Sequence, residues 1–268
     1  MIPVLIILTI LIILFLLSLI GRRNHPDLAM LRGWSYAHRG LHSEGVPENS
    51  IAAFKKALDN GYGIELDIHL MKDSNLAVIH DASLKRTAGA DVNIEDLTAE
   101  DLSKYRLEGT DETIPLFKDV LALFNGKAPM IVELKAVNNY AELCKAACAM
   151  LEKYSGVYCL ESFDPRCIIW LKKNRPELIR GQLAENFIVN PKSKIPFVLK
   201  LAMSWNLGNF LSRPDFVAYR YADRNHFSVH LCRTLWKLQG VSWTLRTKED
   251  YDIAVKEGWI PIFENFMP

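Results

Sequence analysis

Hydrophobic and polar positions alternate in short runs along most of the chain. Nine runs rich in β-branched and aromatic residues are predicted strands, and stretches with helical periodicity lie between most of them. The predicted strands cover residues 35–39, 62–70, 76–80, 130–134, 157–163, 179–183, 216–221, 241–245 and 260–264. Strands that alternate with helices are typical of a parallel sheet joined by helical crossovers.

The second and third predicted strands cannot both be parallel members of such a sheet. Little more than residues 72–75 connects them, whereas a parallel connection needs about a dozen residues or more. The run 76–80 is therefore predicted to return antiparallel, as one arm of a hairpin. Eight strands remain, which predicts an α/β fold of the (β/α)8, or TIM barrel, type with a small hairpin-bearing insertion.

The N-terminus follows a different pattern. Residues 2–20 are largely apolar and carry no charge, and about 20 such residues are enough to cross a bilayer as a helix. The run lacks the basic start and the small-residue cleavage site of a signal peptide. We therefore predict one N-terminal transmembrane helix, with an anchor over residues 1–21, a connector over residues 22–33 and the barrel domain over residues 34–268.

Charge and cysteine content refine this picture. Arg22, Arg23 and Arg32 follow the apolar run, so the positive-inside rule predicts a single-pass protein of the cell membrane with its catalytic domain in the cytoplasm. The five cysteines are odd in number and lack zinc-type spacing, which favours buried free thiols in a reducing compartment. A net charge of only +1 gives no basic surplus, so no nucleic-acid partner is expected.

A second apolar run covers residues 195–211, with Lys200 as its only charge. One interpretation is a helix of the outer ring that packs on the sheet. The other is a segment that lies against a bilayer and admits a lysophospholipid.

Polar residues gather where the predicted strands end, which is where TIM barrels place their sites. Period-two alternation puts Glu65, Asp67 and His69 on one face of their strand, and Glu133 and Lys135 follow at the end of another. A solvated surface strand is the alternative explanation for the alternation. Three converging carboxylates, Glu65, Asp67 and Glu133, are the hard oxygen ligands typical of Mg²⁺ or Ca²⁺.

Two histidines lie near the same predicted face. His38 ends the first strand and His80 ends the hairpin, and a pair of histidines beside a cation suits acid–base catalysis. Arg39 offers a planar, permanently charged partner for a phosphate, and Lys135 a second positive charge.

Several short motifs occur in the order found in one known family. They are His38-Arg39-Gly40, Pro47-Glu48-Asn49-Ser50, Glu65-Leu66-Asp67, His80-Asp81, Leu84-Lys85-Arg86-Thr87, Glu133-Leu134-Lys135, Ser162-Phe163-Asp164 and Trp243-Thr244. With these motifs in this order, the chain resembles the glycerophosphodiester phosphodiesterases over nearly everything after residue 34. Two segments depart from the family pattern: Arg246 replaces a common Asn, and the ending EGWIPIFENFMP replaces Gly-Val-Asp-Gly-Ile-Ile-Thr-Asp-x-Pro.

The resemblance implies a barrel enzyme that cleaves glycerophosphodiesters or lysophospholipids to glycerol 3-phosphate or lysophosphatidate plus an alcohol. It implies roles for eight residues: His38 and His80 as the acid–base pair, Glu65, Asp67 and Glu133 as ligands of Mg²⁺ or Ca²⁺, Arg39 and Lys135 as phosphate contacts, and Trp243 as a pocket wall.

Around these roles, Glu48 and Asn49 are expected to provide support and a helix cap. The sequence leaves open which histidine is the base, and whether water or a glycerol hydroxyl attacks. The alternatives in function are a phospholipase D-type enzyme on other lipid diesters and a noncatalytic phospholipid-binding barrel.

Overall fold

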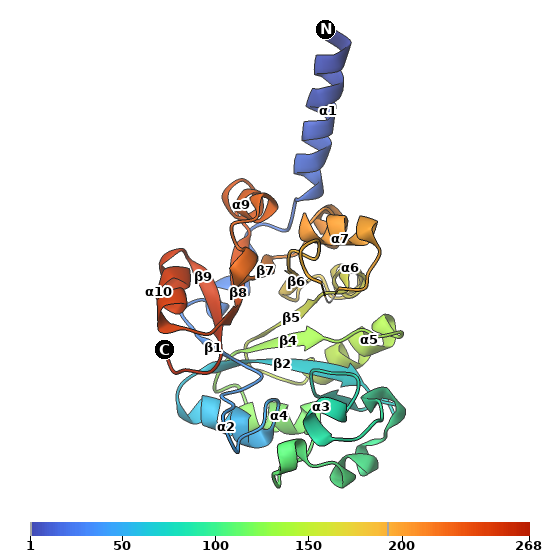
Figure 1. Cartoon of the computed structure of the whole chain (residues 1–268), viewed down its shortest axis with the longest axis vertical. Helices are drawn as coiled ribbons and strands as arrows, with labels where there is room; N and C mark the ends of the chain where they lie inside the picture. The colour runs from blue at the N-terminus through green and yellow to red at the C-terminus, as the bar shows by residue number, and fades with distance from the viewer. Residues whose placement is uncertain (1, 192) are drawn as a thin grey trace.

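The computed structural model describes residues 2–191 and 193–268, and its centre is a closed barrel of eight parallel strands (Figure 1). Each barrel strand pairs with the next one along the chain, and β1 pairs with both β2 and β9, which closes the barrel. The strands are β1 (Tyr36–His38), β2 (Gly63–Leu70), β4 (Met130–Leu134), β5 (Tyr158–Ser162), β6 (Arg180–Ala184), β7 (Phe216–Arg220), β8 (Gln239–Leu245) and β9 (Trp259–Phe263). The predicted (β/α)8 barrel is confirmed.

The ninth strand, β3 (Leu76–Val78), lies outside the barrel. It pairs antiparallel with β2, with Ile68 opposite Val78, so the predicted hairpin is confirmed. The insertion continues through α3 (Lys85–Ala88) and three short 3-10 helices, η2 (Ile94–Asp96), η3 (Ala99–Lys104) and η4 (Leu107–Gly109). Its buried apolar side chains form a small core of their own, separate from the core beneath the outer helices.

Helices surround the barrel in the order expected for crossovers (Figure 1). They are α2 (Ile51–Asp59), α4 (Phe117–Phe124), α5 (Tyr140–Leu151), α6 (Pro165–Asn174), α9 (Phe227–Thr234), which follows the short η5 (Tyr221–Asp223), and α10 (Lys248–Lys256). The predicted cap of α2 by Asn49 is wrong, because the Ser50 hydroxyl accepts the hydrogen bond from the Ala53 amide. All five cysteines are buried and free, as predicted.

The apolar run 195–211 does not form one continuous helix. It contains α7 (Phe197–Ser204) and the start of α8 (Asn209–Ser212), with Asn206 between them in the left-handed region at φ 56°. Ser204 is the one buried residue of α7, so this helix lies on the barrel instead of packing deeply into it.

The segment before β1 closes the N-terminal end of the barrel. The 3-10 helix η1 (Pro26–Leu31) inserts Leu28 and Leu31 into the core inside the barrel. The Tyr36 hydroxyl donates to the Leu31 carbonyl at 3.0 Å. Arg22 donates to both carboxylate oxygens of the buried Asp215 at 2.5 Å. Residues 22–33 thus pack on the barrel, while the domain boundaries themselves stay a prediction.

The N-terminal helix α1 (Ile2–Ser18) projects from the barrel (Figure 1). Residue 1 of the predicted anchor lies outside the described residues. The C-terminal end of α1 is fixed on the barrel domain. Phe15 packs edge-on against Trp205 at 5.8 Å, and the Trp236 indole N–H donates to the Leu16 carbonyl at 3.0 Å. Among the described residues, no helix has the length and apolar character needed to cross a membrane. The predicted transmembrane span is therefore not supported.

The core inside the barrel is tightly packed where β6 meets β7. A Cβ built on Gly181 would lie 2.0 Å from the Phe216 ring, so only glycine fits beside that ring. Gly208 differs, because an added Cβ there meets no heavy atom within 4 Å and its φ is −84°.

We expect Gly181→Ala to lower the free energy of unfolding by about 1–3 kcal/mol, because overpacking forces the Phe216 ring and its neighbours to shift. Gly208→Ala is the matched control and should change it by less than about 0.5 kcal/mol. Chemical denaturation of both variants measures the difference. Equal stability of the two variants would contradict this packing.

Candidate active site

Carboxylates gather at the C-terminal ends of three adjacent strands. The strand register places Asp67 of β2 beside Glu133 of β4, and Glu133 beside Glu161 of β5, while Glu65 lies beside His38 of β1. All four carboxylate residues are buried. Ligand atoms of Glu65, Asp67 and Glu133 lie within 4.8 Å of one another, so the structure brings together the three predicted metal ligands.

Glu161 belongs to the same centre but is absent from the predicted set. It is buried, and among the described residues its Oε2 atom has no hydrogen-bond partner. Burial and then the nearby Glu133 raise its pKa well above the ordinary value. The signal was present in the sequence, because alternation along the predicted strand 157–163 places Cys159, Glu161 and Phe163 on one face.

Two positive side chains reach into the acidic centre. Lys135 Nζ lies 3.0 Å from Asp67 Oδ1 and 2.8 Å from Glu133 Oε1. Arg39 Nε lies 3.5 Å from Asp67 Oδ2, and the Arg39 amide donates to Glu65 at 3.2 Å. Asn49 also donates to Asp67, at 2.9 Å, which explains why it does not cap α2.

The pKa values of the carboxyl groups reflect this crowding. Burial and the neighbouring carboxylates raise the pKa of Glu65 well above its ordinary value. Burial raises the pKa of Glu133 to about 7, even though Lys135 opposes the rise. Burial acts in the same direction on Asp67, but the charges of Lys135, His80 and Arg39 outweigh it and lower the pKa.

The chemistry of the donor set suits a divalent cation. Three buried carboxylates with mutually unfavourable charge need more positive charge than Lys135 and Arg39 supply, since desolvated anions are costly without partners. Oxygen-only ligands of this kind fit a hard cation better than zinc. The residues present therefore fit Mg²⁺ or Ca²⁺, and do not distinguish between them.

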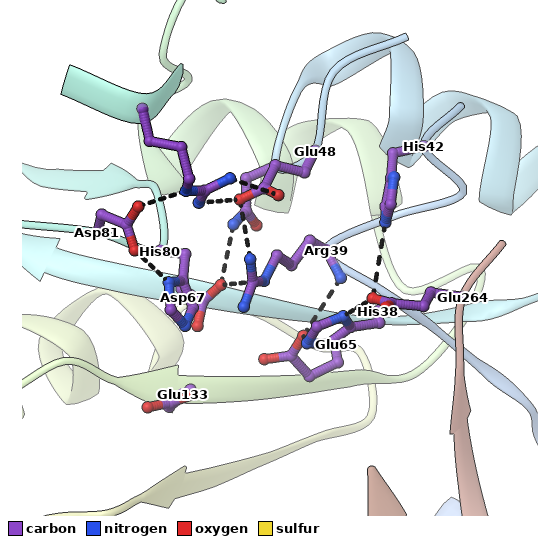
Figure 2. Close-up of polar contacts among 12 residues, drawn as sticks. His38, Arg39, His42, Glu48, Glu65, Asp67, His80, Asp81, Glu133 and Glu264 are labelled. Atoms are coloured by element: carbon purple, nitrogen blue, oxygen red, sulfur yellow. Dashed lines mark hydrogen bonds and ion pairs between the residues drawn. The ribbon is translucent and has the colours of Figure 1, made fainter. Parts of the chain in front are cut away.

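Each of the two predicted catalytic histidines is held by a carboxylate (Figure 2). His38 Nδ1 lies 2.5 Å from Glu264 Oε2, and His80 Nδ1 lies 2.6 Å from Asp81 Oδ1. An Nδ1–H that donates to a carboxylate leaves Nε2 as the acceptor in a neutral ring. In the described part of the chain, no hydrogen bond is formed by Nε2 of either ring.

The pKa values of both histidines favour the neutral ring. Burial lowers the pKa of His38 despite its hydrogen bond to Glu264. Burial, with the charges of Lys135 and Arg39, lowers the pKa of His80 to about 4 although Asp67 opposes the change. At neutral pH both rings are therefore neutral, and Nε2 of each carries no proton.

A chain of ion pairs connects Arg39 with the second histidine (Figure 2). Glu48 accepts from Arg39 at 2.9 Å and from Arg86 at 2.7 and 3.0 Å. Arg86 also donates to Asp81 at 2.5 Å, and Asp81 holds His80. Glu48 thus supports the site as predicted, whereas Arg86 and Glu264 were not identified as site residues.

Trp243 and His69 occupy different positions around the centre. The Trp243 ring meets Phe163 edge-on at 5.5 Å, and its buried indole N–H has no partner among the described residues. His69 is held by Glu95 at 2.6 Å and by the His80 carbonyl at 3.2 Å. His69 therefore fixes the loop that carries His80. Trp243 packs against the core inside the barrel, and its role as a pocket wall stays a prediction.

The chain is similar in sequence to known phosphodiesterases. The chain is 33% identical over 166 residues to a glycerophosphodiester phosphodiesterase of Caldanaerobacter subterraneus, which covers 58% of this chain and 68% of that relative. It is 39% identical over 116 residues to lysophospholipase D GDPD1 of Rattus norvegicus, which covers 38% of this chain and only 36% of that relative.

Two solved structures share the fold. A phosphodiesterase of Oleispira antarctica, in complex with the product sn-glycerol-3-phosphate, has a TM-score of 0.72 at 19% identity, covering 91% of this chain and 95% of that chain. A glycerophosphodiester phosphodiesterase of Thermotoga maritima has a TM-score of 0.66 at 25% identity, covering 86% and 93%.

The model of the glycerophosphoryl diester phosphodiesterase family matches residues 38–267. That range contains the acidic centre and both histidines, and it confirms the resemblance and the enzyme class that the motifs predicted. The chain belongs to the glycerophosphoryl diester phosphodiesterase family.

Proposed function

We propose that this protein is a divalent-cation-dependent phosphodiesterase. It cleaves glycerophosphodiesters or lysophospholipids to glycerol 3-phosphate or lysophosphatidate and an alcohol. The observation that carries the proposal is the cluster of Glu65, Asp67 and Glu133 within 4.8 Å, flanked by two histidines that are each held by a carboxylate. These three residues would hold Mg²⁺ or Ca²⁺, which supplies positive charge that polarises the phosphate when bound.

Arg39 and Lys135 are proposed to contact the phosphate. Arg39 donates to Glu48 through Nη1 and faces Asp67 with Nε. Among the described residues its Nη2 forms no hydrogen bond, so this donor remains for a phosphate oxygen. Lys135 adds a compact positive charge between Asp67 and Glu133. Together they would stabilise the negative charge that develops on the phosphate oxygens in the transition state.

His38 and His80 are proposed to move the protons. One ring, neutral at Nε2, accepts a proton from the attacking water or glycerol hydroxyl. The other acts in its protonated form and donates the Nε2 proton to the leaving alcohol oxygen. Glu264 and Asp81 keep Nδ1 protonated and fix each ring, and they stabilise the imidazolium that forms in either role. We assign the pair and leave the order of the two histidines open.

The helix α1 is proposed to hold the enzyme at a membrane surface. It has no charged residue and no buried residue, and an apolar surface of this extent is typical of a segment that contacts lipid or protein. Insertion into one leaflet requires no complete crossing of the bilayer. The predicted location of the catalytic domain in the cytoplasm, based on Arg22, Arg23 and Arg32, stays a prediction.

The first test is activity. We expect the full chain to release glycerol 3-phosphate from glycerophosphocholine and glycerophosphoethanolamine, and lysophosphatidate from lysophosphatidylcholine, with Mg²⁺ or Ca²⁺ and not with EDTA. His38→Ala and His80→Ala should each lower kcat by about 10²-fold or more, because general acid–base catalysis is lost. His230→Ala, at an exposed position of α9, is the control. Product release in the presence of EDTA, or unchanged release by both His38→Ala and His80→Ala, would contradict the proposal.

The second test concerns Glu264. We expect Glu264→Gln to lower kcat by about 10–100-fold with little change in KM, because the His38 ring loses the charge that orients it. Steady-state kinetics on glycerophosphocholine measure both constants. The exposed Glu249→Gln should change neither constant. A rise in KM at unchanged kcat would assign Glu264 to substrate binding instead.

The third test concerns α1. We expect the full chain to sediment with phosphatidylcholine liposomes, because burial of apolar side chains in lipid is favourable at about 25 cal/mol per Å². A chain that begins at Leu19 should stay in the supernatant while it keeps its activity on glycerophosphocholine, since that substrate is water-soluble. Equal sedimentation of both chains would contradict membrane attachment through α1.

A further inference from the structure

A groove of about 780 Å³ leads from the acidic centre to α7. Glu133 and Lys135 of the centre line one end, and Leu199, Ala202 and Met203 of α7 line the other. Its volume is within the range of about 300–1,000 Å³ that is usual for small-molecule sites. The groove therefore belongs to the same substrate site, at the C-terminal end of the barrel.

The walls of the groove are mainly apolar. Leu134, Phe163 and Leu183 from the strand ends line it, as does Ile195, which lies before α7. Asp164 and Arg166 also line it, but they form an ion pair with each other at 2.6 Å. A charged group lying along the α7 wall would lose water without gaining a partner, which is unfavourable.

The outer edge of the groove continues into an exposed apolar surface. Phe197 and Val198 of α7 are 67% and 74% exposed, and Leu199, which lines the groove, is 51% exposed. The helix α7 lies at the same end of the molecule as the base of α1 (Figure 1), and Trp205 just after it contacts Phe15 of α1. A long apolar ligand can therefore enter over the exposed apolar side chains of α7.

We propose that this groove binds the acyl chain of a lysophospholipid whose phosphate is held at the acidic centre. The proposal rests on the proposed function and specifies its substrate class. The occupant has to be connected to the phosphate, because the groove begins at Glu133 and Lys135, and it has to be apolar along α7. A glycerophosphodiester without an acyl chain has no part that meets the second requirement.

The experiment compares two substrates that share glycerol, phosphate and choline and differ only in the acyl chain. In the full chain, Ala202→Phe fills the groove, and Leu199→Asp places a charge in it at a half-exposed position. Ala149→Phe adds the same bulk at an exposed position of α5, which does not line the groove or its entrance. The kinetic constants for lysophosphatidylcholine and glycerophosphocholine are measured for each variant with the cation present.

We expect Ala202→Phe and Leu199→Asp to lower kcat/KM for lysophosphatidylcholine by about tenfold or more, the scale of a lost apolar pocket contact. The value for glycerophosphocholine should stay within twofold, which also shows that the variants fold. Ala149→Phe should leave both values unchanged. Equal effects on both substrates, or no effect of either groove variant, would overturn the proposal.

Calorimetric titration with lysophosphatidylcholine below its micellar concentration separates this proposal from the proposed function. The cation is present, and both proteins carry His38→Ala to prevent turnover. Binding by the full chain that is lost in Ala202→Phe supports the groove even when neither substrate is cleaved, in which case only the proposed function fails. Absence of binding, or binding that Ala202→Phe leaves unchanged, overturns the groove even when glycerophosphocholine is cleaved. The lipid also contacts α1, but that contribution is identical in both proteins.

Discussion

The mutual repulsion of buried carboxylates at one end of the barrel is the constraint on which the rest of the site depends. Closure of the sheet forces the ends of β2, β4 and β5 toward one axis, so Asp67, Glu133 and Glu161 share one level. Lys135 and Arg39 offset part of this charge. Breaking one partner of such a buried set is costly, because the remaining charge stays desolvated. The surrounding ion pairs therefore act as a scaffold for a centre that favours further positive charge.

The two histidines depend on parts of the chain that are far apart in sequence. His80 and Asp81 come from the insertion, and Arg86 ties that insertion to Glu48 in the first loop. His38 is held by Glu264, which follows the last strand. Because β1 pairs with β9, the two ends of the catalytic domain meet at this histidine. Closure of the first strand on the last therefore aligns the His38 ring, whereas contacts between the insertion and the first loop align the His80 ring.

Much of this arrangement is predictable from sequence for local reasons. Alternation within one strand identifies Glu65 and Asp67, and the short connection after β2 identifies the hairpin. Glu264 was missed because its role arises from strand closure, which no local pattern records. The split of run 195–211 follows from the left-handed backbone at Asn206, and apolar composition carries no sign of it. The N-terminal helix ends at Ser18 because the following residues turn to pack, with Leu19 buried and Arg22 bound to Asp215.

Arg246 and Glu264 lie in the two segments where the sequence departs from the usual family pattern, and they contact each other at 2.6 Å. The two departures are therefore one physical change. Glu264 holds His38 with one carboxylate oxygen, and Arg246 donates to the other oxygen. Selection would act on the pair, since a glutamate without its arginine, or the reverse, leaves an unbalanced charge at the barrel mouth. In related sequences the identities at these two positions should covary, and a chain that carries one without the other should show a third residue that takes the missing place.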